Sequence, residues 1–184
     1  MSSLETPLPI RLAQTLGITS SLVLAGQTLS TSFVTAPRLL ESPASLLLRQ
    51  WGNMYDVGKK TGPTISAIAS SAFFYLAYKT HVSNLALLNT TGYWTGRNWL
   101  YTLAGFLSVG IVPYTFAVML PTNKELLRKV EVVRRVETSE EDEVERKDLE
   151  RNAHQLVDSW ATLNLGRGFM LLGSGVLGVW ASLV

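Results

Sequence analysis

The chain has 184 residues, a mean hydropathy of +0.20, and 47% hydrophobic against 16% charged residues, which suits one small integral membrane domain better than a soluble globule. The net charge is +2 and the basic residues form no stripe of the kind that binds nucleic acid, so no nucleic-acid partner is expected. Cysteine is absent, which excludes disulfides, iron–sulfur clusters, thiolate zinc sites and cysteine nucleophiles.

Four apolar stretches predict four transmembrane helices. They cover about residues 12–34, 62–78, 99–120 and 160–183, and about 20 residues of helix cross a hydrocarbon core of roughly 30 Å. The first stretch is too long for the core of a cleaved signal peptide, so we expect it to be retained. The predicted fold class is all-α, a four-helix transmembrane bundle that forms a single membrane domain over residues 1–184.

The basic residues predict the orientation of this bundle. Most lysines and arginines lie in the loops at 35–61 and 121–159, and such residues concentrate on the cytosolic side of a membrane. The opposite side has few of them and carries the sequon at Asn89, whose glycosylation the sequence leaves open. We expect loops one and three to be cytosolic, with the protein in the endoplasmic reticulum or derived vesicles.

The third loop contains two helical patterns. Apolar residues recur at helical spacing over 125–136 opposite basic ones, which predicts a short helix lying on the anionic leaflet. Thr138 and Glu141 form a capping-box pattern, which can begin a helix that leads into the last span. The acidic run at 140–143 is then the solvated start of that helix.

The last span carries an arginine inside an apolar stretch. Arg167 follows Trp160 and Asn164 at i+7 and i+3, so the three side chains project from one helix face. A guanidinium in hydrocarbon costs on the order of a few kcal/mol on insertion scales. A residue kept at this cost faces a partner, a cavity or a ligand, and we expect a pocket here.

Other polar groups fall at a similar depth in the predicted bundle. Gln27 in the first span and Tyr114 in the third each lie about two turns, roughly 10 Å, from the cytosolic end. Asn123 directly follows the third span. Trp51 and Tyr55 precede the second span and can cover the same cavity. A helical bundle can therefore gather these residues around the arginine.

Each of these residues also has a structural explanation. Trp51 and Trp160 lie near the predicted interface, where aromatic belts are common. Asn164 and Gln27 can hydrogen-bond a neighbouring helix. Asn123 follows Thr122 and Pro121, a pattern for which helix capping is favoured over catalysis. The arginine is the residue for which burial argues most strongly for a function.

The two histidines fall on opposite sides of the predicted membrane. His81 is lumenal and His154 cytosolic, so they cannot hold one metal within a subunit, and no His-x-x-His or Glu-x-x-His pattern is present. A metal or haem site with a single histidine stays open. His154 precedes Trp160 by about 9 Å of continuous helix. It is either a surface residue or a base at the mouth of the pocket.

Several motifs resemble those of a known family. They are Trp51 followed by Tyr55 and Gly58, the run Leu120, Pro121, Thr122 and Asn123, and the spaced set Trp160, Asn164 and Arg167. With the four predicted spans, they resemble the fungal anthrone oxygenases over nearly the whole chain. These belong to a larger membrane family first catalogued as a domain of unknown function.

The resemblance implies oxidation of a polyketide anthrone to an anthraquinone by dioxygen, as in emodin-type secondary metabolism. The implied substrate is a small hydrophobic polyketide, dioxygen is the co-substrate, and no organic cofactor is required. The sequence does not identify which anthrone is oxidised. It also leaves a metal or haem open.

The resemblance also implies roles for the pocket residues. Arg167 would stabilise the oxyanion of the deprotonated anthrone. Asn164 and Gln27 would orient the ring oxygens, and Trp160 and Trp51 would stack on the tricycle. The general base stays open, with three candidates: His154, Tyr55 and Tyr114.

Three other interpretations stay open. A non-catalytic carrier needs openings to both sides, whereas the lumenal half of the last span is nearly all apolar. A scaffold for pathway enzymes needs no buried arginine. A metal-dependent oxygenase would share its site across subunits. Glycines along the last span permit close helix approach within the bundle or between subunits, so a homo-oligomer stays open as well.

Overall fold

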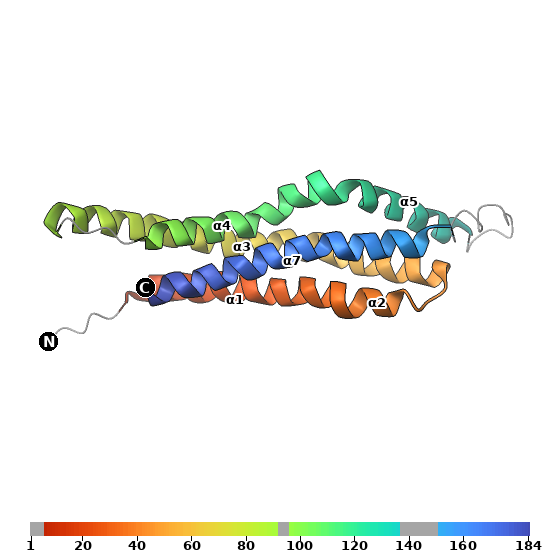
Figure 1. Ribbon diagram of the computed structural model, residues 1–184, viewed down its shortest axis with the longest axis horizontal. Coiled ribbons are helices and arrows are strands. Elements are labelled where there is room, and N and C mark those ends of the chain that lie inside the picture. Colours follow the sequence, from red (N-terminus) through yellow and green to blue (C-terminus); the bar gives the residue numbers. More distant parts are fainter. Residues whose placement is uncertain (1–5, 92–95, 137–150) are drawn as a thin grey trace. The chain divides into compact units, whose positions relative to one another are not determined.

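The computed structural model describes residues 6–91, 96–136 and 151–184, which form helices and no strand (Figure 1). In chain order the elements are α1 (Leu8–Ser30), the π-helical segment η1 (Thr31–Thr35), α2 (Ala36–Leu39), α3 (Ala44–Thr91), α4 (Arg97–Tyr114), the π-helical segment η2 (Thr115–Met119), α5 (Leu120–Val136) and α7 (Ala153–Leu183). The all-α class predicted from the sequence is confirmed.

The second predicted span belongs to a much longer helix. α3 has 48 residues, about 70 Å at a rise of about 1.5 Å per residue. Pro63 lies inside α3, where it removes one backbone donor without ending the helix. Much of the predicted loops on either side of residues 62–78 is therefore helical, and Asn89 lies exposed within α3.

The helix predicted at 125–136 is not a separate one. α4, η2 and α5 follow one another without a break, so helical backbone precedes Thr122 and Asn123. Because there is no helix start at this point, the capping role predicted for these two residues is wrong. The capping box at Thr138 and Glu141 and the acidic run at 140–143 lie outside the described residues.

The chain divides into two compact units. Unit 1 comprises Met1–Gly26, Pro63–Ile111 and Phe169–Val184, and unit 2 comprises Gln27–Gly62 and Val112–Gly168. The boundaries between the units fall inside α1, α3, α4 and α7, so each of these helices contributes residues to both units. The single membrane domain predicted from the sequence stays a prediction.

Unit 1 packs its helices through small residues and serine hydroxyls. A Cβ at Gly17 would lie 2.9 Å from the Phe73 ring, so α1 and α3 approach closely there. The Ser108 and Ser174 hydroxyls are 3.0 Å apart and join α4 to α7. Ser66 donates to the carbonyl of Ser108 at 2.7 Å. These contacts satisfy buried polar groups among apolar helices.

Unit 2 has its own core of apolar side chains, mainly from α3, η2, α5 and α7. Its largest members are fully or nearly fully buried: Trp51, Leu47, Leu48, Met119, Leu126, Val157 and Trp160. Gly52 permits the close approach of α3 and α5, because a Cβ there would lie 2.9 Å from Val130. Tyr55 and Tyr114 pack against this core.

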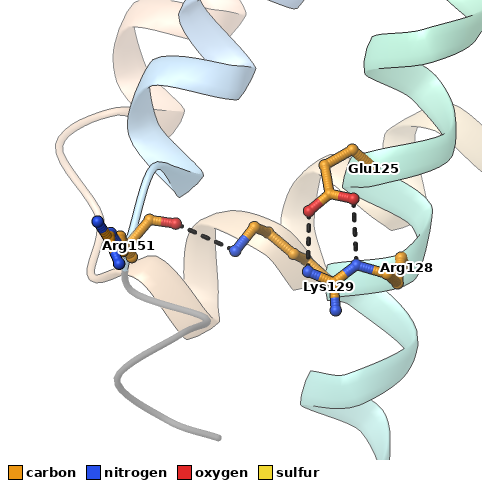
Figure 2. A network of polar contacts seen from close by, with 4 residues as sticks. All are labelled: Glu125, Arg128, Lys129 and Arg151. Atoms are coloured by element: carbon orange, nitrogen blue, oxygen red, sulfur yellow. Dashed lines mark hydrogen bonds and ion pairs between the residues drawn. The ribbon is translucent and has the colours of Figure 1, made fainter.

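A polar contact joins α5 to the start of α7 within unit 2 (Figure 2). Lys129 is 3% exposed, and its Nζ donates to the backbone carbonyl of Arg151 at 3.0 Å. Beside it, Arg128 makes two hydrogen bonds to the Glu125 carboxylate, at 2.8 and 3.1 Å. Asn152, with φ of 67°, then turns the chain into α7.

Charge is distributed unevenly between the two units. Among the described residues, every aspartate and glutamate belongs to unit 2, whereas the charged side chains of unit 1 are Arg11, Lys79 and Arg97. The stretches Leu8–Leu39 and Arg97–Arg135 are long and apolar enough to cross a membrane, by length and composition alone. Crossing by α3 and α7 stays a prediction.

Candidate functional site

Arg167 lies on α7 and turns its guanidinium toward Asn164, one helical turn earlier. Nη1 donates to Oδ1 of Asn164 at 3.3 Å, whereas Nε is buried and has no hydrogen-bond partner. Within the described part of the chain, no carboxylate forms an ion pair with Arg167. The arginine therefore presents a cationic N–H group that the described residues leave available.

The orientation of the Asn164 amide is fixed by contacts with the first helical stretch. Nδ2 donates to the carbonyl of Thr28 at 3.1 Å and to the hydroxyl of Ser32 at 3.0 Å. Because both N–H groups of the amide are engaged there, Oδ1 is the atom that faces Arg167. Asn164 is 3% exposed. It positions Arg167 and has no donor left for a ligand.

Glycines make room for this group. A Cβ at Gly62 would lie 3.2 Å from Nη2 of Arg167, so the guanidinium passes directly over α3. A Cβ at Gly166 would overlap the hydroxyl of Tyr114, and one at Gly168 would overlap the Leu29 side chain. Glycine on either side of the arginine thus lets α7 approach its neighbours closely.

Two tyrosines lie within electrostatic range of the Arg167 guanidinium, Tyr55 on α3 and Tyr114 at the end of α4. The Tyr114 hydroxyl donates to the carbonyl of Leu163 at 2.9 Å. The Tyr55 hydroxyl makes no such bond with any described residue, and Lys59 lies over its ring at 5.9 Å. Tyr55 is therefore the phenol that is free to act on a ligand.

The two indoles of the site pack against each other and against Tyr55. Trp51 stacks on Tyr55 with ring centroids 4.9 Å apart and an interplanar angle of 18°. Trp160 meets Trp51 edge-on at 5.7 Å and 90°. Stacking on a ligand stays a prediction for Trp51, one face of which is covered by the phenol. Its N–H group, by contrast, is unpaired.

Unpaired polar atoms gather in this part of unit 2. In the described residues, four buried side-chain atoms lack a hydrogen-bond partner: Nε1 of Trp51, Nε1 of Trp160, Nε of Arg167 and Oδ1 of Asn123. Asn123 shares a helix face with Met119 at the end of η2 and with Leu126 and Val130 on α5, all of which are buried in the core. Buried polar groups are normally paired. Three donors and one acceptor are therefore available to an oxygen-bearing ligand.

Two predicted site residues lie away from this cluster. Gln27 is exposed, and the asparagine contacts come from Thr28 and Ser32 instead. His154 is exposed at the start of α7, where its Nε2 lies 3.0 Å from the carbonyl of Ser42. The structure brings together Trp51, Tyr55, Tyr114, Asn123, Trp160, Asn164 and Arg167.

Two acidic residues, Asp56 and Asp158, lie near site residues in the sequence, and neither pairs with Arg167. Asp56 accepts a hydrogen bond from Lys59 at 2.6 Å and pairs with Arg134 at 3.5 Å. The hydrogen bond from Lys59, with the charge of Arg134, holds the pKa of Asp56 below its ordinary value. Asp158 lies exposed on α7. The positive charge of Arg167 thus stays uncompensated within the described residues.

Two other kinds of binding feature are a cluster of metal ligands and an apolar groove. Across 6–91, 96–136 and 151–184, no three His, Asp or Glu side chains converge as metal ligands would. Unit 1 has an open groove of about 890 Å³ between α1 and α3, lined mainly by apolar side chains such as Leu12, Leu16 and Ile68. None of the predicted site residues lines it.

Sequence reasoning missed three residues that shape the site. Thr28 and Ser32 lie near Gln27, in a stretch rich in serine and threonine where no single residue stands out. Gly62 matters through the side chain it lacks. Gly62 lies two helical turns after Tyr55 on α3, and this spacing could have placed both residues on one helix face.

The fold and the site define a class: an all-helical protein with apolar helices of membrane-crossing length and a buried cluster of cationic, indole and phenol groups. Residues 51–177, more than half of the chain, match the family described as anthrone oxygenase. The chain belongs to the anthrone oxygenase family. This membership places it among enzymes of the oxidoreductase class.

Relatives from several fungi are similar over most of their length. The anthrone oxygenase encC of Aspergillus fumigatus is 29% identical over 180 residues, covering 94% of this chain and 93% of that protein. The anthrone oxygenase AgnL2 of Paecilomyces divaricatus is 27% identical, with 90% and 92% covered. The noranthrone monooxygenase of Aspergillus flavus is 27% identical, with 85% and 66% covered. No solved structure matches the chain significantly.

Proposed function

We propose that this protein oxidises a polyketide anthrone to the anthraquinone with dioxygen, at the cluster around Arg167. The observation that carries the proposal is the set of buried, unpaired N–H groups of Arg167, Trp51 and Trp160 in an apolar surrounding. An anthrone is a flat apolar molecule with oxygen atoms at its edge. Such donors can bind those oxygens while the surrounding core excludes water.

The chemistry needs one proton transfer before oxygen reacts. Loss of a methylene proton from the anthrone gives a phenolate-like anion, because the charge is delocalised onto the ring oxygen. The anion passes one electron to dioxygen, and recombination forms a carbon–oxygen bond to a hydroperoxide. The oxygen–oxygen bond then breaks with loss of the second methylene proton. One anthrone and one dioxygen give one anthraquinone and one water.

Arg167 is assigned to the oxygen that becomes negative on deprotonation. A guanidinium N–H in a dry site stabilises an oxyanion far more than it would in water. Asn164 holds the guanidinium through its Oδ1 and does not itself reach the ring oxygens. The acceptor Oδ1 of Asn123 suits a ring hydroxyl, and the indole N–H groups suit its neighbouring oxygens.

Tyr55 is our candidate for the base. Its hydroxyl has no partner among the described residues, and it lies within electrostatic range of Arg167. Tyr114 is less suited, because its hydroxyl already donates to Leu163. Neither His154 nor Gln27 has a role in this scheme, since both are exposed away from the cluster.

We further propose that the helices form the four-span bundle predicted from the sequence, in the endoplasmic reticulum or derived vesicles, with the loops at 35–61 and 121–159 cytosolic. The two apolar helical stretches and the lack of described aspartate and glutamate in unit 1 support this topology. In this arrangement the substrate reaches the site from the bilayer. Dioxygen is the co-substrate and no organic cofactor takes part.

The test is anthrone-dependent oxygen uptake by purified, metal-stripped protein in detergent. We expect the wild type to consume one dioxygen per quinone formed, and Arg167→Ala to lose about 100-fold or more of kcat, the usual cost of an oxyanion donor. Arg38→Ala is the matched control, since Arg38 is exposed and pairs with Glu41.

The other outcomes separate the alternatives. Uptake that returns when a metal is added would retain the oxygenase and overturn the cofactor-free chemistry. No uptake under either condition by a folded protein would favour a carrier or a scaffold. Full activity of Arg167→Ala would overturn the assignment of the site.

A further inference from the structure

The contacts of Ser32 point to a role for a residue that no catalytic scheme has used. Ser32 lies in η1, the π-helical segment that follows α1, and is 7% exposed. Its hydroxyl accepts from Nδ2 of Asn164 at 3.0 Å and donates to the carbonyl of Thr28 at 3.5 Å. Isolated π-helical turns are often found at functional sites.

Three contacts close into a small network. The Thr28 carbonyl accepts from Asn164 at 3.1 Å and also from Ser32. The amide of Asn164 therefore meets an acceptor with each of its two N–H groups, and its Oδ1 is left for Nη1 of Arg167 at 3.3 Å. The hydroxyl of Ser32 and the carbonyl of Thr28 together fix which end of the amide faces the arginine.

We infer that Ser32 is a positioning residue for Arg167 and acts through Asn164. The inference rests on the proposed function, because it takes Arg167 to face the reacting oxygen. Without the hydroxyl, one N–H of Asn164 loses its acceptor, and the NH₂ group is held by the Thr28 carbonyl alone. The amide, and with it the guanidinium that donates to its Oδ1, is then less firmly oriented.

The close approach of α7 to the first helical stretch supports this assignment. Gly168, next to Arg167, lies so near to Leu29 that a Cβ would overlap its side chain. Backbone spacing at this level is therefore set by direct packing. The hydrogen bonds among Ser32, Thr28 and Asn164 then orient the guanidinium of Arg167 between the packed helices.

The experiment measures binding of emodin, a hydroxylated anthraquinone of the proposed product class, to the purified full-length protein by quenching of tryptophan fluorescence. We expect Ser32→Ala to weaken binding about three- to tenfold, the effect of one lost hydrogen bond. In the Arg167→Ala background the same substitution should have no further effect. Ser32→Thr, which keeps the hydroxyl, should bind as the wild type does.

Ser30→Ala is the matched control, since Ser30 is exposed and makes no side-chain capping bond. A residue with a purely structural role would weaken binding equally with and without the arginine, and that result would overturn the inference. So would unchanged binding in Ser32→Ala, or wild-type protein that does not bind emodin at all. Oxygen uptake by the wild type is measured separately, so failure of the proposed function remains distinguishable.

Discussion

At the scale of single residues, the site is built from side chains whose own hydrogen bonds are incomplete. Leaving a buried donor unpaired costs on the order of 1–3 kcal/mol. Trp51, Trp160 and Arg167 each keep one such donor, while nearby Asn164 and Tyr114 are fully engaged with backbone or side-chain partners. The paired residues hold the geometry, and the unpaired atoms are those that a ligand can use.

A test of this geometry uses the contact between Gly166 and Tyr114. Gly166→Ala places a Cβ against the Tyr114 hydroxyl, so the phenol must move and its bond to Leu163 is strained or broken. We expect the free energy of unfolding to fall by about 1–3 kcal/mol, as for other overpacked cores. Thermal unfolding in detergent, with activity in parallel, measures the change.

Gly58→Ala is the control for that substitution. No atom lies within 4 Å of a Cβ built at Gly58, and this glycine also lies inside a helix. Alanine there should stabilise the protein by roughly 0.5–1 kcal/mol, because it lowers the entropy of the unfolded chain. Equal effects of the two substitutions would contradict the packing against Tyr114.

The sequence alone singled out Arg167, Asn164 and Trp160, because their chemistry is unusual for their position. An arginine, an asparagine and a tryptophan on one face of an apolar helix stand out by spacing alone. Gln27 was chosen by the same logic and lies exposed. The depth of a residue along a helix can be counted from the sequence. The direction in which its side chain points within a bundle depends on how the helices pack, which the sequence does not show. Ser32 and Thr28 were missed for that reason.

At the scale of the elements, the two π-helical segments occur beside the site. η1 carries Ser32, and η2 begins directly after Tyr114. A π-helical turn contains an extra residue, so the side chains after it face a different direction from those of a continuous α-helix. Pro113 precedes η2 and cannot donate a backbone hydrogen bond, which is a physical reason for the irregular turn there. No comparable signal precedes η1.

Helix lengths were less predictable than helix existence. Apolar stretches marked where α3 and α4 run, since their hydrophobic residues continue for many turns. The ends of α3 were missed, because α3 continues through polar, charged sequence on both sides of residues 62–78, and the helix predicted at 125–136 is continuous with α4. These polar turns are held by tertiary contacts such as Gly52 against Val130 and by ion pairs such as Asp56 with Arg134. Tertiary packing of this kind overrides local composition.

The ion pairs of Asp56 with Lys59 on α3 and with Arg134 on α5 predict a dependence on pH. Because the folded-state pKa of Asp56 is lowered, its contribution to stability is present above the ordinary carboxyl pKa and is lost as the pH falls through the lower, folded value. Asp56→Asn should therefore be slightly less stable than the wild type near neutral pH. The gap should close below about pH 4.

Thermal unfolding across that pH range measures the gap. Asp158→Asn is the control, as Asp158 is exposed on α7 and forms no ion pair with a described residue. The effect should also shrink in high salt, since the Asp56 pairs are partly exposed. A gap that widens in acid would show that the pairing with Lys59 and Arg134 does not hold in solution.

At the scale of the whole molecule, the division of charge matches the division into two units. The described residues of unit 1 include no aspartate or glutamate, and unit 2 contains the charged turns and the candidate site. Acidic side chains are costly in hydrocarbon, so the composition of the described part of unit 1 suits the membrane interior. In the proposed topology α1, α3, α4 and α7 each cross the bilayer.

Because the chain has no cysteine, this topology can be tested with single substitutions and no background reaction. Suitable exposed positions lie at each end of the four helices: Thr6→Cys, Gln50→Cys, Ser83→Cys, Gln155→Cys and Val184→Cys. In sealed microsomes, a membrane-impermeant maleimide should label Gln50→Cys and Gln155→Cys, which lie on the cytosolic side in this topology. The other three variants should react only after the membrane is permeabilised.

The pattern distinguishes four crossings from two. If the stretches Leu8–Leu39 and Arg97–Arg135 cross alone, Ser83→Cys joins Gln50→Cys on the labelled side and Gln155→Cys becomes protected. With four crossings, labelling alternates at each position along the chain. Ser71→Cys adds a check on depth: it is exposed on α3 between two of these markers and should react only after denaturation, because lipid covers it. Alternating labels with a protected residue 71 require α3 to pass through the bilayer, and residues 155 and 184 on opposite sides require the same of α7, the helix that carries Arg167.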